Sequence, residues 1–312
     1  MNSNPASPKS LLRLLAYPVA VVLLACVISP PLYWAGNYLA EAGILKVVQG
    51  FPFHRYFSRS IQISAMVLLW PAFHGLGIRR LSELGIEPNR RWRSDLAIGF
   101  LFAFLPLLAL GAWYFFTGVY EMRPDWEAAK FLRVAGTACA VSVVEEFLFR
   151  CVFLGLCLMA MGRVAAVGLS AVFFAGVHFF KTSKQPLEAP VTWLSGFEQL
   201  PLLFSSAPPW PLLGWAFFSL LLAGILLSAG TLRTRSLFLA IGLHAGWIFG
   251  QQGMQVIGRF SIKPPDSLLP WVGENVVSGA VPTGVLPLLA LGFTGILIAM
   301  FLRHATRDRQ GV

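Results

Sequence analysis

The stretch VSVVEEFLFRCVFLGLCLMA, residues 141–160, decides how the rest of the chain is interpreted. It is apolar enough to cross a membrane, yet it carries two adjacent glutamates, Glu145 and Glu146, and Arg150 one turn later. A charged group at the centre of a bilayer costs about 2.5–3.5 kcal/mol on insertion scales. Three such groups within six residues do not help a helix to insert. We therefore expect them to serve a function inside the membrane.

The whole chain has the composition of a polytopic membrane protein. Of its 312 residues, 56% are hydrophobic and 12% are charged, whereas about 25% of the residues in soluble domains are charged. Apolar runs of about 20 residues are long enough to span a bilayer. Eight such runs lie near residues 14–36, 60–78, 96–118, 133–161, 164–181, 211–230, 236–257 and 283–302. We predict an all-α polytopic membrane protein of about eight transmembrane helices, with residues 1–312 forming a single integral-membrane domain.

The distribution of basic residues indicates the orientation. Thirteen Lys and Arg residues lie in the N-terminus, in alternate, mostly short loops and in the C-terminal tail, and ten lie in the other four, longer loops. Cytoplasmic segments carry the excess, so we expect both termini to be cytoplasmic. As a separate expectation, the membrane is a bacterial inner membrane. The net charge of +10 fits this rule, and no motif indicates a nucleic-acid partner. The first apolar run is expected to be retained as a span, and the four cysteines are expected to be buried structural thiols.

The acidic pair predicts a division of labour on one helix. Glu146 and Arg150 are four residues apart, so they share a face in the order that favours an ion pair. Glu145 is turned about 100° away. We expect Arg150 to neutralise Glu146, which leaves Glu145 facing a cavity where a carboxylate can act as a general base.

Two histidines lie in other predicted spans. His178 is near the end of the fifth, and His244 lies among small residues in the seventh. A glutamate and two imidazoles from three helices can converge on one buried water molecule, which suits hydrolysis. Counted at 1.5 Å per residue, His244 is nearer the cytoplasmic end of its span than Glu145 is. Convergence therefore requires the seventh span to tilt or to begin before residue 236.

The same residues are also compatible with roles other than catalysis. A lone histidine in a membrane often bridges helices by a hydrogen bond, and a Glu–Arg pair can act as a structural staple. Buried Glu and His also occur in proton-coupled transporters, although the chain shows no repeated halves. The second glutamate favours catalysis, because a staple does not need it.

These residues resemble the three ordered motifs of a known family. Glu145-Glu146-x-x-x-Arg150, then Phe174-x-x-x-His178, then His244 are similar to the motifs of the CAAX-protease and bacteriocin-processing (CPBP, or Abi) intramembrane endopeptidases. The resemblance covers residues 135–255 and implies a protease core there. It implies that Glu145 activates water together with His178, and that His244 contributes to the oxyanion site. Glu146, Arg150 and Phe174 would be structural or supporting residues.

One position departs from the family pattern. Asn or Asp is usual four residues after the third-motif histidine, and this chain has Ile248 there. One oxyanion donor, or one partner for His244, is therefore missing, and losing such a donor costs about 10²–10³ in rate. Gln251 shares the helical face but lies about 10 Å further along. It is not an obvious substitute.

The expected mechanism uses neither a metal nor another cofactor. Two His and two Glu resemble a zinc ligand set, but a carboxylate paired with Arg150 is poorly suited to bind metal. The sequence thus predicts a glutamate-dependent intramembrane endopeptidase that acts on a membrane-anchored protein or peptide in contact with lipid. The alternatives are an inactive scaffold or immunity-type member of the family, and a zinc-dependent protease using the same residues.

Overall fold

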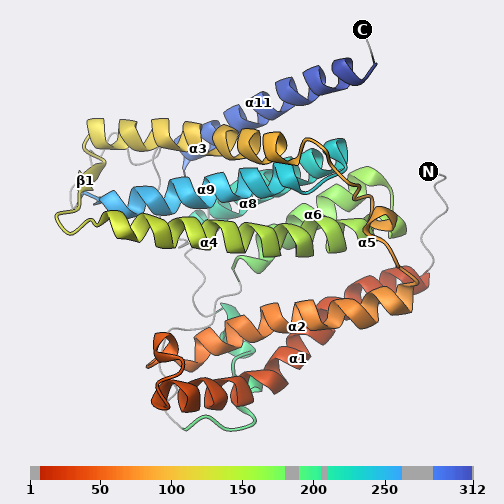
Figure 1. The fold of residues 1–312 in the computed structure, drawn as a ribbon, viewed down its shortest axis with the longest axis vertical. Helices are drawn as coiled ribbons and strands as arrows, with labels where there is room; N and C mark the ends of the chain where they lie inside the picture. The colour runs from red at the N-terminus through yellow and green to blue at the C-terminus, as the bar shows by residue number, and fades with distance from the viewer. Residues whose placement is uncertain (1–7, 180–189, 205–209, 262–283, 311–312) are drawn as a thin grey trace. The chain divides into compact units, whose positions relative to one another are not determined.

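The computed structural model describes residues 8–179, 190–204, 210–261 and 284–310, and these are mostly helical (Figure 1). The α-helices are α1 Pro8–Glu41, α2 Phe53–Leu76, α3 Trp92–Phe116, α4 Ala128–Glu146, α5 Leu154–Ala160, α6 Arg163–Val177, α7 Ser195–Glu198, α8 Trp210–Thr234, α9 Phe238–Ile257 and α11 Val285–Gln310. A π-helical segment, Phe147–Phe153, joins α4 to α5. Short 3₁₀ turns are η1 Lys46–Val48, η2 Leu81–Leu84 and η4 Pro201–Phe204, and the strands are β1 Tyr120–Met122 and β2 Gly258–Phe260.

The prediction of an all-α polytopic membrane protein is confirmed. Each of the eight predicted spans contains a helix, although residues 180 and 181 of the fifth and residue 283 of the eighth lie outside the described residues. Within the described ranges, four helical stretches are long and apolar enough to cross a membrane: Ala16–Glu41, Trp92–Phe116, Leu213–Thr234 and Val285–Arg303. The fourth predicted span is a helix in three consecutive parts, α4, the π segment and α5.

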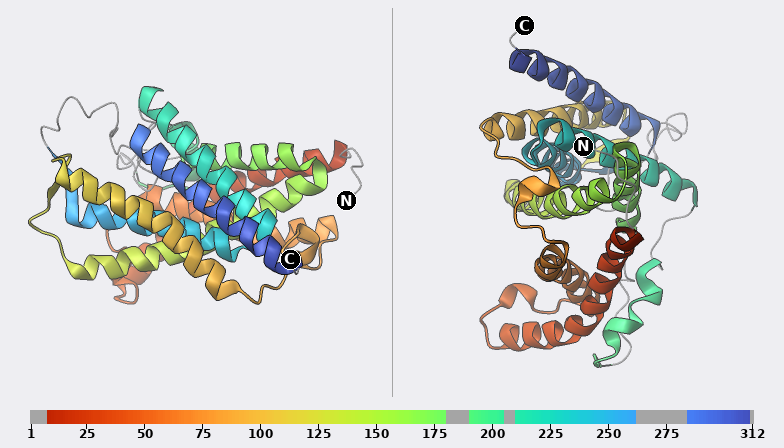
Figure 2. Two further views of the ribbon diagram at one scale, coloured as in Figure 1. Left: turned by 90° about the horizontal axis from the view of Figure 1, so that it is seen from above. Right: turned by 90° about the vertical axis from the view of Figure 1, so that its right-hand side faces the viewer.

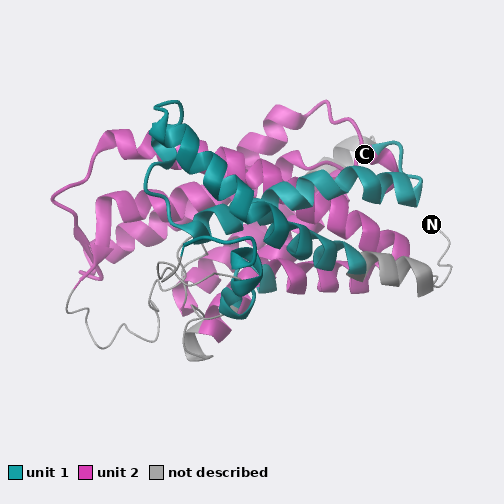
Figure 3. Ribbon diagram, turned by 90° about the horizontal axis from the view of Figure 1, so that it is seen from below, with its two compact units in different colours: residues 1–80, 176–207 teal, residues 81–175, 208–312 magenta. Residues whose placement is uncertain are grey.

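The chain divides into two compact units, which are coloured separately in Figure 3. Unit 1 comprises residues 1–80 and 176–207, and unit 2 comprises residues 81–175 and 208–312. The single domain expected over residues 1–312 stays a prediction. Unit 2 contains most of the predicted protease core.

Unit 1 is built on the helix pair α1 and α2. The Tyr17 hydroxyl donates to the Ala65 carbonyl at 2.6 Å, and Cys26, Phe53 and Phe57 form a buried apolar cluster with Leu203. Pro30 has no N–H, so the Cys26 carbonyl has no helical donor four residues later. Gly196 of α7 packs closely against that carbonyl, where a side chain would collide.

Helix α9 is the centre of unit 2 and lies between α3 and α4 (Figures 1 and 2). Its glycines recur every four residues, at Gly242, Gly246 and Gly250, and form one face. Cβ atoms added at the first two would meet the backbone carbonyls of Leu96 and Phe100 in α3. The absence of side chains therefore allows the two helix backbones to approach closely.

Hydrogen bonds also connect the segments at both ends of the α3–α9 pair. Before α3, the Asn89 side-chain amide donates to Asp95 Oδ2 at 2.8 Å and lies 3.1 Å from the Ser236 hydroxyl, just before α9. After the two helices, β1 and β2 pair antiparallel, with Tyr120 opposite Phe260. The two helices therefore start at the same end of unit 2 and run in parallel. This fixes the depth of each residue of α9 relative to α3.

The cysteine prediction is correct for three of the four residues. Cys26, Cys151 and Cys157 are buried, but Cys139 is exposed on α4. It lies outside the buried face of that helix, which contains Ala138 and Ser142. Apolar sequence context did not reveal this, because in a membrane protein the exposed face is also apolar.

Candidate active site

The acidic pair lies at the C-terminal end of α4, where the burial pattern gives the two carboxylates different surroundings. One face of the helix is buried at every fourth residue, Val134, Ala138, Ser142 and Glu146. Glu146 continues this stripe, and its side chain is 0% exposed. Glu145 is turned away by about 100° and keeps 21% of its side chain exposed. Of the two glutamate side chains, that of Glu145 is therefore the partly exposed one, although its Oε2 atom is buried.

The helix changes its winding directly after Glu146. In the segment Phe147–Phe153, backbone hydrogen bonds join residues that are five apart, as where the Leu154 N–H donates to the Phe149 carbonyl. Such π-helical turns are rare and are frequent at functional sites. Residues 150–157, which begin within this segment, are all buried. The change of winding thus coincides with the point where the helix enters the packed interior of unit 2.

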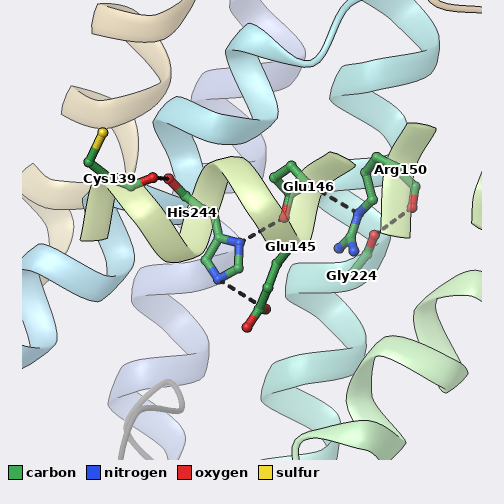
Figure 4. Close-up of polar contacts among 8 residues, drawn as sticks. Cys139, Glu145, Glu146, Arg150, Gly224 and His244 are labelled. Carbon is green, nitrogen blue, oxygen red and sulfur yellow. Dashed lines mark hydrogen bonds and ion pairs between the residues drawn. The ribbon is translucent and has the colours of Figure 1, made fainter. Parts of the chain in front are cut away.

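The ion pair expected between Glu146 and Arg150 is present (Figure 4). Arg150 Nε lies 3.3 Å from Glu146 Oε2, and both side chains are fully buried. The Phe174 ring covers the guanidinium, with Arg150 Cζ 4.2 Å from the ring centre. In the described part of the chain, neither terminal nitrogen of Arg150 has a hydrogen-bond partner. Glu146 and the aromatic ring therefore provide the principal compensation for this buried charge.

His244 reaches the acidic pair because of the glycine face of α9. It is two residues from both Gly242 and Gly246, so it projects from the side of α9 opposite to α3. Its Nδ1 lies 2.7 Å from Glu146 Oε1, and its Nε2 lies 3.9 Å from Glu145 Oε2. The imidazole also packs edge-to-face with the Phe174 ring, and the two ring centres are 5.9 Å apart. Figure 4 shows the ring between the two glutamates.

The structure brings together five of the six predicted site residues, and all five belong to unit 2. They are Glu145, Glu146, Arg150, Phe174 and His244. His178 lies in the turn that follows α6, where it is half-buried, and it belongs to unit 1. Its part in the site, and the catalytic role of each of the other residues, stay predictions.

One contact was missed by the sequence analysis. Glu146 was assigned to Arg150 alone, but its second oxygen binds His244 on another helix. Two signals in the sequence point to this contact. Glu146 continues the stripe of Ala138 and Ser142 that faces α9, and the glycine face of α9 turns His244 toward α4.

The position one turn after His244 is apolar in space as well as in sequence. Ile248 is buried, with 7% of its surface exposed. Gln251 shares the same face of α9 and is buried too, at 3%. The Asn or Asp that the resemblance leads us to expect one turn after His244 is therefore absent from α9, and two carboxylates of α4 lie beside the imidazole.

The arrangement is suited to proton transfer beside a polarised carbonyl. Glu145 offers a carboxylate on a partly exposed side chain, and His244 directs Nε2 toward it. Glu146 uses one oxygen for His244 and the other for Arg150. Among the described residues, no group of three or more His, Cys, Asp or Glu side chains has an arrangement that could hold a metal ion.

A family model matches this part of the chain. Residues 127–250 match the family described as type II CAAX prenyl endopeptidase, Rce1-like. The match covers less than half of the chain, and it includes both the acidic pair on α4 and His244 on α9. No curated protein and no solved structure matches the chain.

Proposed function

We propose that the protein is an intramembrane endopeptidase, because residues 127–250 match the family described as type II CAAX prenyl endopeptidase, Rce1-like, which is consistent with a CPBP-family protein. It hydrolyses a peptide bond in the membrane-proximal or C-terminal segment of a membrane-anchored protein or peptide. One observation carries the proposal. Oε2 of Glu145, whose side chain is partly exposed, lies 3.9 Å from Nε2 of His244, at the edge of a buried ion network.

In the proposed reaction, Glu145 is the general base. It takes a proton from water, and the water oxygen attacks the carbonyl carbon of the scissile peptide bond. The carbonyl oxygen gains negative charge, which an N–H at Nε2 of His244 stabilises. The proton then passes to the nitrogen of the leaving amine as the C–N bond breaks. His178 assists Glu145 in orienting the water, and no cofactor takes part.

The proposed location follows from the distribution of charge. Both termini and the Arg-rich loop that leads into α3, residues 79–95, lie on the cytoplasmic side of a bacterial inner membrane. The partners are lipid and the membrane-anchored substrate. The substrates to test first are peptides with a prenylated C-terminal cysteine motif, because the family description names prenyl substrates.

The test is cleavage of such peptides by the purified protein in detergent, read by mass spectrometry. Glu145→Gln keeps the shape of the side chain but removes the base, so we expect cleavage to fall by about 10²–10⁴. Glu127→Gln is the matched control: Glu127 precedes the same helix, its side chain is 65% exposed, and it pairs with Lys130. Wild-type cleavage by the Glu145→Gln variant would remove the basis of the proposal.

A second candidate function is favoured by Ile248. A site that lacks a polar group one turn after His244 fits a scaffold that binds a partner without cleaving it. Complementation separates the two candidates, because a scaffold tolerates Glu145→Gln in cells and a protease does not. The zinc-dependent alternative predicts that a chelator inhibits cleavage and that zinc restores it. The proposed mechanism predicts no effect of either addition.

A further inference from the structure

We propose that Glu146 is a positioning residue: it fixes the orientation and the protonated nitrogen of His244, so that Nε2 is presented to the reaction. This inference rests on the proposed function and adds a role for a residue otherwise assigned to the Arg150 ion pair. The need for such a partner is visible in α9 itself. One turn before and one turn after His244, that helix carries Ala240 and Ile248, which offer no side-chain hydrogen bond.

The contact between the two residues defines which nitrogen carries a proton. His244 Nδ1 lies 2.7 Å from Glu146 Oε1, with both side chains buried. An ionised carboxylate can only accept a hydrogen bond, so Nδ1 must carry the proton and donate it. Nε2 is then the nitrogen left for the reaction. Donation to the oxyanion requires the doubly protonated ring, with Nδ1–H on Glu146 and Nε2–H on the substrate oxygen.

Glu146 is itself held rigidly enough to orient a neighbour. Its other oxygen, Oε2, lies 3.3 Å from Arg150 Nε, and the Phe174 ring closes over the guanidinium. Phe174 also packs edge-to-face with the imidazole of His244. Phe174 therefore contacts both Arg150, which holds Glu146, and His244, which Glu146 positions. A rigid neighbour restricts the rotation of a catalytic side chain, and this improves the geometry of reaction.

A simple staple between Glu146 and Arg150 would not account for the geometry. One carboxylate oxygen is sufficient for the ion pair, yet the second is directed at a histidine 98 positions further along the chain. The arrangement resembles a carboxylate–imidazole pair of a hydrolytic triad, in which the acid sets the tautomer. In such triads the acid also stabilises the imidazolium, and exchange of the acid for its amide lowers kcat about 10⁴-fold.

Three variants separate positioning from structural support. Glu146→Gln removes the negative charge that stabilises the doubly protonated ring, and it leaves an amide that can donate to Nδ1 of a neutral ring. Glu146→Asp keeps an acceptor-only group at a longer reach. The double variant Glu146→Gln, Arg150→Met also removes the buried cation that Glu146→Gln leaves without its counter-charge, so it keeps the protein foldable if the single variant unfolds.

We expect Glu146→Gln and the double variant to lower kcat about 10²–10⁴-fold, with KM changed by less than about threefold. Glu146→Asp should retain at least about tenfold more kcat than Glu146→Gln. The exposed control Glu127→Gln should behave as wild type. In ¹⁵N-histidine-labelled wild-type protein, with the signal assigned by its loss in His244→Gln, Nδ1 should carry a hydrogen-bonded proton.

Two results would overturn the inference. One is a folded double variant with the kcat of wild type, and the other is a wild-type His244 whose Nδ1 has no proton. The nitrogen measurement needs no substitution at Glu146, so it decides the question even if every Glu146 variant unfolds. Failure of the proposed function looks different, because then Glu145→Gln would also leave cleavage unchanged.

Discussion

At the scale of single residues, two glutamates that are neighbours in sequence have separate surroundings. Glu146 lies on the buried stripe of α4, with both oxygens engaged, while Glu145 is one helical step away and partly exposed. The difference arises from the 100° rotation between successive residues of a helix. An adjacent pair of acids can therefore supply a fixed charge and an accessible base from the same turn.

Substitution of Phe174 should test how much its ring stabilises the buried charge of Arg150. Its side chain is 2% exposed and its ring covers Arg150. Phe174→Leu removes a desolvated cation–π contact of about 2 kcal/mol and leaves part of the volume empty. We expect a loss of stability of about 2–4 kcal/mol, measured by thermal unfolding in detergent, with cleavage reduced as well. Phe116→Leu is the control, because Phe116 is 91% exposed; equal losses in the two variants would contradict the assignment.

At the scale of elements, the approach of α3 and α9 positions His244. The contact depends on glycines whose added Cβ atoms would meet the backbone of the other helix. A helix–helix contact of this kind has little freedom to slide. It therefore determines both the level of His244 and the direction in which it points.

Gly246→Ala should separate the two helices. The new Cβ would lie against the Phe100 carbonyl and 2.9 Å from Ala103 Cβ, so we expect a loss of about 1–3 kcal/mol of stability and slower cleavage. The matched control is Gly168→Ala in α6, where nothing lies within 4 Å. There, the better helix propensity of alanine should raise stability by about 0.5–1 kcal/mol. Thermal unfolding of the two variants checks both signs, and a neutral Gly246→Ala would show that the helices are not held by this contact.

At the scale of the whole molecule, unit 2 has a defined sidedness. Helices α3 and α9 begin at the end tied by Asn89 and Ser236, and both continue to the end where β1 and β2 pair. Helix α4 then begins from the β1 side. The Arg-rich segment before α3 and the N-terminus of α4 are thus expected on opposite sides of the membrane.

Cysteine labelling can check this orientation. In a variant without its four native cysteines, Glu127→Cys should react with a membrane-impermeant maleimide added to intact spheroplasts. Ser94→Cys, which is also exposed, should react only after the membrane is permeabilised. The reverse pattern would place the Arg-rich segment outside the cell and contradict the assignment of both termini to the cytoplasm.

Sequence alone was sufficient to predict the class of the protein, the approximate helices and the five candidate residues that the structure brings together. Apolar length and charge spacing are local properties, so a helix in each of the eight apolar runs, the Glu146–Arg150 pair and the separate orientation of Glu145 could be predicted without coordinates. Which helices contact one another became known only from the folded chain.

Counting residues from span ends placed His244 at a different depth from Glu145, yet α9 begins only at Phe238 and the two side chains still meet. Helix ends need not be level, because their depth follows from close packing of helix backbones, as at Gly242 and Gly246, and that packing depends on residues distant in sequence. The second partner of Glu146 is a consequence of that packing.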